Sequence, residues 1–241
     1  MYSTFGDIEK ALTVFQNIEN PDLVSWNSKL SGFSGKVGKL IEMFIQFYKK
    51  KFVKPDDYTF AIIISATRSL PACSYGKPLH GQVIKLGFDS NVYIGSTLVS
   101  MYFDNSDTES AQKLQVLIPI KDIVFWTEMI TGHARTGYGH HGKVNKALMI
   151  FDEIVKRGLI PDEVTYLSML SACNHSGLID KAKFLWSSMN ENGLIPGSKH
   201  YSFFVGLLSR AGLLEEAESM IMKIDEHNRR ALPWKKWWRR G

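Results

Sequence analysis

The chain has 241 residues, of which 44% are apolar and 22% are charged, and this balance excludes a wholly disordered protein. Its apolar runs stay short of the roughly eighteen residues that a membrane-spanning helix needs, and Cys73 and Cys173 are too far apart in sequence for a CxxC zinc site and too few for a disulfide framework. The net charge of +5 comes from residues 227–241, which carry four Arg, two Lys and no acid, so residues 1–226 are nearly neutral.

Similar landmarks recur along the chain from its N-terminus. One string reads GDIEKA at residues 6–11, SDTESA at 106–111, GKVNKA at 142–147, GLIDKA at 177–182 and GLLEEA at 212–217. A second segment opens each repeat at residues 23, 57, 92, 123, 163 and 198, with separations of 34, 35, 31, 40 and 35 residues. Such a period predicts a helical-repeat array. We expect half a repeat at residues 1–22, then repeats 23–56, 57–91, 92–122, 123–162, 163–197 and 198–224.

Each repeat is expected to form two antiparallel helices. Its opening segment has apolar residues three and four positions apart, such as Trp26, Leu30 and Phe33, which share one helix face. A glycine ends this first helix, and the second helix carries an alanine that lets the two backbones approach closely. A further glycine and a Pro-Asp pair, as at Pro161-Asp162, end the second helix. Because one hairpin cannot cover its own apolar stripe, the predicted fold class is an all-α solenoid of about six and a half stacked repeats.

Two segments depart from this pattern. Repeat 123–162 is unusually long and contains GHARTG at 132–137 followed by GYGHHG at 137–142, which predicts an irregular loop. Residues 225–241 predict an irregular basic and aromatic tail that binds nucleic acid or an anionic membrane surface, or else is a frayed terminus without function. His140 and His141 are expected in a solvated turn rather than in a metal site, and the two cysteines are expected as buried thiols.

The repeats resemble the pentatricopeptide repeat family. The residues that carry the resemblance are the openers LVSWN at 23–27 and IVFWT at 123–127 and the closer GLIPD at 158–162. TLVSMY at 97–102 and HYSFFVGLLSRAGLLEEA at 200–217 are similar to short repeats of the plant PLS subgroup, in which long and short repeats alternate. The resemblance covers about residues 1–224. It implies a chain truncated at both ends, which lacks upstream repeats and an organellar leader.

This resemblance implies recognition of single-stranded RNA, with about one base for each repeat. The fifth and the last residue of a repeat would form a reading pair. By this rule Asn27 with Asp56 reads uracil, whereas Thr127 with Asp162, and Ser96 with Asp122, read a purine with guanine preferred. In the pair Ala61–Asn91 only Asn91 is polar. The pair Leu167–Gly197 has no polar side chain and would read no base. The residue three before the early position would stack on the base; four of these residues are Val24, Tyr58, Tyr93 and Val124.

Other interpretations stay open for the same residues. Asn, Ser and Thr also favour helix starts, and a closing Asp also caps the following helix, for reasons unrelated to RNA. The resemblance implies a specificity factor for RNA processing or C-to-U editing in a mitochondrion or chloroplast. This factor would be a monomer without catalytic residues, metal or cofactor, would not act at a membrane, and would rely on a processing or editing enzyme in trans. The alternatives are a helical scaffold for a protein segment, and an inactive remnant of a longer repeat protein.

Overall fold

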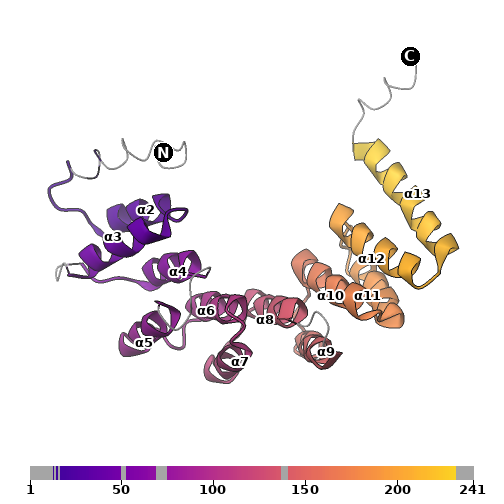
Figure 1. Cartoon of the computed structure of the whole chain (residues 1–241), viewed down its shortest axis with the longest axis horizontal. Coiled ribbons are helices and arrows are strands. Elements are labelled where there is room, and N and C mark those ends of the chain that lie inside the picture. The colour runs from indigo at the N-terminus through magenta and orange to yellow at the C-terminus, as the bar shows by residue number, and fades with distance from the viewer. Residues whose placement is uncertain are drawn as a thin grey trace, which may run out of the picture. The chain divides into compact units, whose positions relative to one another are not determined.

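The computed structural model describes residues 13, 15, 17–49, 53–68, 75–136 and 141–231, which form twelve helices joined by turns, without a strand among them. Two compact bodies divide the chain, an N-terminal body at Met1–Glu128 and a C-terminal body at Met129–Gly241. The fold is all-α and built from stacked helix pairs, as the repeat pattern predicts (Figure 1).

The N-terminal body contains three helix pairs and the start of a fourth. Its helices are α2 (Leu23–Gly32), α3 (Val37–Lys49), α4 (Asp57–Ala66), α5 (Lys77–Lys85), α6 (Val92–Asp104), α7 (Thr108–Leu117) and the first part of α8 (Ile123–Thr136). Within each pair the two helices pack together, α2 on α3, α4 on α5 and α6 on α7. The first helices of neighbouring pairs also pack, α2 on α4 and α4 on α6, and so form one continuous layer.

The C-terminal body repeats this plan. It contains the end of α8, then α9 (His141–Lys156), α10 (Glu163–Ser176), α11 (Ile179–Glu191), α12 (Ser198–Arg210) and α13 (Leu214–Ala231). The first helices α10 and α12 pack side by side, and their partners α11 and α13 pack against them. All six first helices of the chain begin at the residues where the sequence landmarks open a repeat, which are residues 23, 57, 92, 123, 163 and 198.

The core lies between the two helices of each pair and between successive pairs. Trp26 and Leu30 of the first apolar stripe are buried, and the Trp26 ring stacks on Phe47 of α3 at 5.0 Å between centroids. Burial of one such side chain stabilises the fold by about 1.5–3 kcal/mol. The alanine of the second helix is buried in each case described, at Ala111, Ala147, Ala182 and Ala217. Its small side chain allows the helices of one repeat to approach closely.

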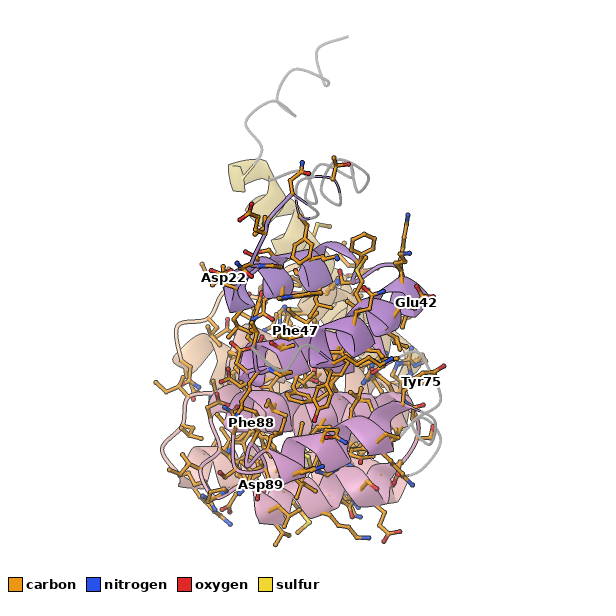
Figure 2. All side chains as sticks on the ribbon, turned by 90° about the vertical axis from the view of Figure 1, so that its left-hand side faces the viewer. Asp22, Glu42, Phe47, Tyr75, Phe88 and Asp89 are labelled. Atoms are coloured by element: carbon orange, nitrogen blue, oxygen red, sulfur yellow. The ribbon has the colours of Figure 1, made fainter. Side chains whose placement is uncertain are left out.

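Figure 2 views the N-terminal body from its α2–α3 end, with Phe47 in the interior. Asp22 and Asp89, which lie in the turns before α2 and α6, are on one edge of the stack. Glu42 of α3 and Tyr75, just before α5, are on the opposite edge. The turns that lead into first helices therefore share one edge of this body, where the closing residues of the repeats are found.

Left-handed residues end the helices, as the glycine landmarks predict. Gly177 and Gly212 follow first helices with φ of 68° and 77°, and the amide after each one donates to a carbonyl five residues earlier. In repeat 92–122 the equivalent residue is Ser106, which has φ of 60°. The turn is the same, since the Asp107 amide donates to the Tyr102 carbonyl at 2.9 Å. A residue with a Cβ atom adopts this conformation only at a cost.

Two expectations about irregular segments need correction. Residues 132–136 of the expected irregular loop are the last turn of α8, and residues 137–140 lie outside the described part of the chain. Residues 225–231 of the expected irregular tail continue α13, because no Gly or Pro interrupts residues 214–232. The remainder of the tail, residues 232–241, lies outside the description.

Candidate nucleic-acid interface

The residues predicted to stack on bases are exposed side chains on the first helices. Each is the second residue of its helix, and in the N-terminal body their exposed fractions are 70% for Val24, 47% for Tyr58, 50% for Tyr93 and 52% for Val124. Exposed large apolar side chains at the same position of successive packed helices form a recurring apolar surface on this layer. The rings of Tyr58 and Tyr93 provide flat surfaces on which bases can stack, and Val24 and Val124 provide apolar contact.

The closing residue of every repeat described is the N-cap of the next first helix. Asp56, Asp122 and Asp162 each accept a hydrogen bond from the backbone amide three residues later, at 2.8 Å in all three cases. Asp22 and Asn91 do the same at 2.8 and 3.1 Å. The capping interpretation of these residues is therefore correct. Whether a closing residue has a second role depends on its other contacts.

Asp56 has such a second contact, to its predicted partner Asn27. The Asn27 Nδ2 group donates to Asp56 Oδ1 at 3.2 Å, and the hydroxyl of Thr59 lies 2.7 Å from Asn27 Oδ1. Thr59 also lies 2.6 Å from Asp56 Oδ1 and accepts from the Asp56 amide at 3.3 Å. Asn27 and Thr59 are buried. The three side chains fix the orientation of the Asn27 carboxamide, with its nitrogen toward Asp56 and its oxygen toward Thr59.

The ionisation of Asp56 supports this arrangement. Partial burial acts to raise the pKa of its carboxyl group, but hydrogen bonds from the side chain and amide of Thr59 and from Asn27 outweigh burial, so that the pKa lies below its ordinary value. Asp56 is therefore a carboxylate at neutral pH and only accepts hydrogen bonds. This requires Asn27 to present its N–H side to Asp56.

The pair Ser96–Asp122 has a different geometry. Ser96 is buried, and its hydroxyl donates to the Val92 carbonyl of its own helix at 2.9 Å. Because a serine hydroxyl carries one proton, this bond uses its only donor. Asp122 is exposed and caps α8 through the amide of Phe125. One turn further along α6, Ser100 donates to Glu128 and joins α6 to α8.

The pair Thr127–Asp162 combines residues of the two bodies, so the pairing stays a prediction. Thr127 is buried on α8 in the N-terminal body. Asp162 caps α10 in the C-terminal body, where the Thr165 amide and hydroxyl lie 2.8 and 2.7 Å from its Oδ1 atom. Thr165 therefore orients Asp162 as Thr59 orients Asp56.

The two remaining pairs offer fewer polar groups. Ala61 is buried, and Asn91 donates through Nδ2 to Asp57 at 3.0 Å in addition to its capping bond. In the last pair, Leu167 is half-buried and Gly197 precedes α12. The imidazole of His200 accepts from the Gly197 amide at 3.1 Å, and its Nε2 atom lies 3.0 Å from the Glu163 carbonyl. His200 thus links the starts of α10 and α12.

Sequence reasoning missed Thr59 and His200, although a signal for them exists. Both stand three residues after a closing residue, which is the N3 position of a capping box. Thr165 occupies the same position in repeat 163–197. The D-x-x-T spacing at Asp56 and Asp162 identifies the closing acids that have an orienting side chain beside them.

Arginines join the C-terminal ends of neighbouring first helices in both bodies. Arg68 after α4 forms an ion pair with Asp104 of α6 at 2.5 Å, and Arg210 of α12 donates to the Asn174 carbonyl of α10 at 2.6 Å. Lys121 donates to the Ile118 carbonyl at 2.6 Å. Only Arg68 is neutralised by an acid, whereas Arg210 and Lys121 donate to neutral oxygens and keep their charge. The first-helix layer offers only a modest positive charge because α4, α6 and α10 carry no Lys or Arg.

Metal and thiol chemistry have little support in the residues described. These residues contain no group of three His, Cys, Asp or Glu side chains that could hold a metal ion. Cys173 is buried, as expected, and burial raises the pKa of its thiol to about 12. Cys73 and His140 lie outside the described residues. None of the described helices is both long and apolar enough to cross a bilayer.

Comparisons with known proteins identify similar repeats in this chain. Residues 121–175 match the PPR repeat family, and residues 164–194 and 200–228 match the PPR repeat. From Arabidopsis thaliana, pentatricopeptide repeat-containing protein At4g16470 is 34% identical over 72% of this chain and 34% of its own length. Putative pentatricopeptide repeat-containing protein At3g23330 is 37% identical over 72% of this chain and 24% of its own length. The chain thus spans about a third or less of these two relatives.

The fold also matches a solved structure of the same repeat class. The maize pentatricopeptide repeat protein PPR10, in complex with an 18-nt psaJ RNA element, superposes with a TM-score of 0.70 over 94% of this chain and 33% of the maize chain, at 20% identity. The likeness shows an all-α solenoid fold. Together, the matched repeats and the plant relatives support the assignment of this chain to the pentatricopeptide repeat proteins.

Proposed function

We propose that this chain binds single-stranded RNA sequence-selectively, as a specificity factor for organellar RNA processing or C-to-U editing, and has no catalytic activity of its own. The repeat assignment supports RNA as the ligand, since the maize neighbour was solved with an RNA element. One plant relative has "mitochondrial" in its name, which supports an organelle. The chain would act as a monomer in a mitochondrion or chloroplast, and a processing or editing enzyme bound in trans would supply the chemistry.

The observation that carries the proposal is the oriented carboxamide of Asn27. An Asn side chain has two N–H groups and two acceptor lone pairs. Asp56 takes one N–H, and the Thr59 hydroxyl, whose one proton is shared between Asp56 and Asn27, lies beside Oδ1. This leaves one N–H donor and at least one acceptor lone pair of the carboxamide side by side. The edge of uracil offers an acceptor, O4, beside a donor, N3–H, and matches this pattern. Val24 and Tyr58 are exposed on the same helix layer and would hold the base by stacking.

The other reading pairs extend this interface. Asp162 has its own orienting threonine, so Thr127 with Asp162 is the stronger candidate for a purine, with guanine preferred. Ser96 uses its proton within α6, so with Asp122 it contributes a weaker preference of the same kind. Tyr93 and Val124 are the stacking residues of these two repeats.

A selection on random RNA with the whole chain tests the proposal. The parent should enrich a motif with uracil at one position, and Asn27→Thr should move that position toward guanine. Asn190→Thr provides a matched control, because it makes the same change at an exposed residue of α11, a second helix. Absence of enrichment by the parent, or the same motif from Asn27→Thr and from the parent, would contradict sequence-selective binding.

The salt dependence of RNA affinity separates the repeat layer from the basic tail. The described first helices carry few cations, and α4, α6 and α10 carry none, so affinity should fall only gently as salt rises. Removal of residues 232–241, which follow α13, should leave both the motif and the slope nearly unchanged. A steep slope that disappears on this removal would place RNA binding in the tail instead.

A further inference from the structure

The second helix α11 ends at the dipeptide Asn192-Gly193, where Gly193 adopts a φ of 74°. Asparagine followed by glycine is the pairing that most readily loses ammonia, because glycine has no side chain to hinder its amide nitrogen. Four other glycines of the described residues also have a positive φ, and the residues before them are Leu86, Arg157, Ser176 and Ala211. The turn after α11 therefore has a chemical reactivity that these equivalent turns lack.

The reaction of such a dipeptide is intramolecular and needs only water. The backbone nitrogen of Gly193 attacks Cγ of Asn192, the new C–N bond closes a succinimide ring, and the bond from Cγ to Nδ2 breaks. The leaving nitrogen takes up the proton of the Gly193 amide and departs as ammonia. Water then opens the ring at either carbonyl, and the product is aspartate or isoaspartate with release of a proton.

The turn that contains this dipeptide is open to water. Asn192 and Gly193 are both exposed, and a Cβ atom added to Gly193 would meet no other group within 4 Å. Water and hydroxide can therefore reach both the Gly193 amide, which must lose its proton, and the succinimide, which must be hydrolysed. Solvent access does not limit the reaction at this turn.

Hydrogen bonds restrain the reacting groups while the turn is folded. The Nδ2 group of Asn192 donates to the Tyr166 hydroxyl at 2.8 Å and to the Ser188 carbonyl at 3.0 Å. The Gly193 amide donates to the Asn190 carbonyl at 2.9 Å, so its proton is engaged. Tyr166 is fully buried on α10 and is therefore a fixed partner. The attack on Cγ thus requires local opening of the turn.

We infer that Asn192 is a deamidation site, that the Tyr166 hydroxyl restrains the reaction, and that the product loosens the contact between α10 and α11. An aspartate at this position has no N–H for the Ser188 carbonyl and places a carboxylate oxygen beside it. An isoaspartate also inserts a methylene group into the backbone before Gly193. The inference goes beyond RNA binding and does not depend on it.

Incubation of the whole chain in a mildly alkaline buffer, followed by peptide mass mapping, tests the site. Deamidation should appear at Asn192 faster than at Asn190, which is on the same helix but precedes Glu191. The isoaspartyl product should also accept a labelled methyl group from S-adenosylmethionine when an isoaspartyl methyltransferase is added. Deamidation that is no faster at Asn192 than at Asn190 would overturn the site.

Tyr166→Phe tests the restraint, because it removes the hydroxyl and keeps the ring. Deamidation of Asn192 should become about fivefold faster, the factor by which the loss of one hydrogen bond favours local opening. Tyr201→Phe makes the same change at the equivalent position of α12 and should leave the rate unchanged. Circular dichroism checks that the helices remain. An unchanged rate in Tyr166→Phe, or an equal rise at Asn190, would overturn the restraint.

Asn192→Asp imitates one product and tests its effect on packing. This variant should have a lower midpoint of thermal unfolding than the parent, because the end of α11 loses its donor to the Ser188 carbonyl and its N–H beside Tyr166. Asn190→Asp is the matched control, since Asn190 donates only to the Trp186 carbonyl of its own helix. Its midpoint should fall less, and equal midpoints of the two variants would overturn the loosening.

Discussion

The pairs Asn27–Asp56 and Ser96–Asp122 occupy equivalent positions in two repeats of the N-terminal body, yet only the first is joined by a hydrogen bond in the residues described. Both aspartates cap a helix through the same backbone geometry, with N–O distances of 2.8 Å. Capping is therefore common to the closing acids. What differs is whether the acid is also connected to the preceding first helix.

Two side chains account for the difference. Asn27 is long enough to reach across to the next turn, whereas the short hydroxyl of Ser96 bonds to its own backbone at 2.9 Å. Three residues after the acid, the first pair has the polar Thr59, and the second has Phe125, which is fully buried in the core. A polar residue pair thus forms an oriented site only when the N3 position of the next helix provides a third polar group.

The largest expected effect comes from removal of the connected acid. Asp56→Ala should lower the free energy of unfolding by about 2–3 kcal/mol, because it removes a helix cap and leaves the buried Asn27 without its acceptor. Asp122→Ala should cost only about 1 kcal/mol, the value of the cap alone. Urea unfolding followed by circular dichroism measures both. Equal losses would show that the hydrogen bond to Asn27 contributes nothing.

A subtler change removes one hydroxyl. Thr59→Val keeps the shape of the side chain but deletes the group beside Asn27 Oδ1, and should destabilise the chain by about 1 kcal/mol. It should also broaden the uracil preference at one position of the selected RNA, because the carboxamide is no longer held in one orientation. Thr165→Val, the same change in the C-terminal body, should leave that position selective. Loss of uracil selection in Thr165→Val as well would refute a local effect of Thr59.

Much of the fold follows from local chemistry that sequence displays directly. The start of each first helix coincides with its landmark because the preceding Asp or Asn caps it, as Asp22 and Asn91 do. Left-handed helix ends coincide with Gly87, Gly158 and Gly193 because glycine adopts positive φ without steric penalty. These signals depend only on residues a few positions apart, so one sequence is sufficient to find them.

The candidate site was less predictable, because its contacts depend on distances between helices. The hydrogen bond from Asn27 to Asp56 joins a first helix to the turn after the second helix of its pair. Whether the Ser96 hydroxyl bonds to its own backbone depends on how deeply it is buried. The same limit explains the expected loop at 132–142, where α8 continues through Gly132 to Thr136. Gly132 resembles a helix end in sequence, but the buried neighbours His133 and Ala134 hold the segment in the helix.

Repeat 92–122 also differs from the other repeats in the residue that ends its first helix, which is Ser106 instead of glycine. A substitution can restore the glycine. Ser106 adopts the left-handed conformation that Gly177 and Gly212 adopt in equivalent turns. Ser106→Gly should therefore raise the free energy of unfolding by about 0.5–1 kcal/mol, after allowance for the greater freedom of glycine in the unfolded chain. Thermal unfolding should show a higher midpoint. Gly212→Ser, the reverse change, should lower it, and a fall on Ser106→Gly would contradict the strain argument.

The smallest expected effect is a pH dependence that distinguishes the neutral His80–Tyr102 hydrogen bond from the ionised Asn27–Asp56 pair. His80 of α5 lies 2.8 Å from the Tyr102 hydroxyl of α6, and burial lowers the pKa of His80 below its ordinary 6.5 although Asp89 acts in the opposite direction. Burial and Asp107 raise the pKa of Tyr102 to about 12, so its hydroxyl remains protonated beside the neutral imidazole, whose tautomer decides which of the two groups donates. The unfolded chain takes up a proton more readily than the folded chain, so stability should fall as pH drops through 6.5.

Urea midpoints at pH 7.5 and 5.5 would reveal this loss, and His80→Gln should reduce it. His175, whose pKa is also lowered by burial and by Arg210, titrates equally in parent and variant and therefore cancels in the comparison. Asp56 behaves differently, because its lowered pKa keeps it ionised until pH falls below its ordinary 3.8. The neutral His80–Tyr102 contact should therefore weaken in mild acid, while the Asn27–Asp56 hydrogen bond persists. An identical response of His80→Gln and the parent between these two pH values would exclude His80 as the sensitive group.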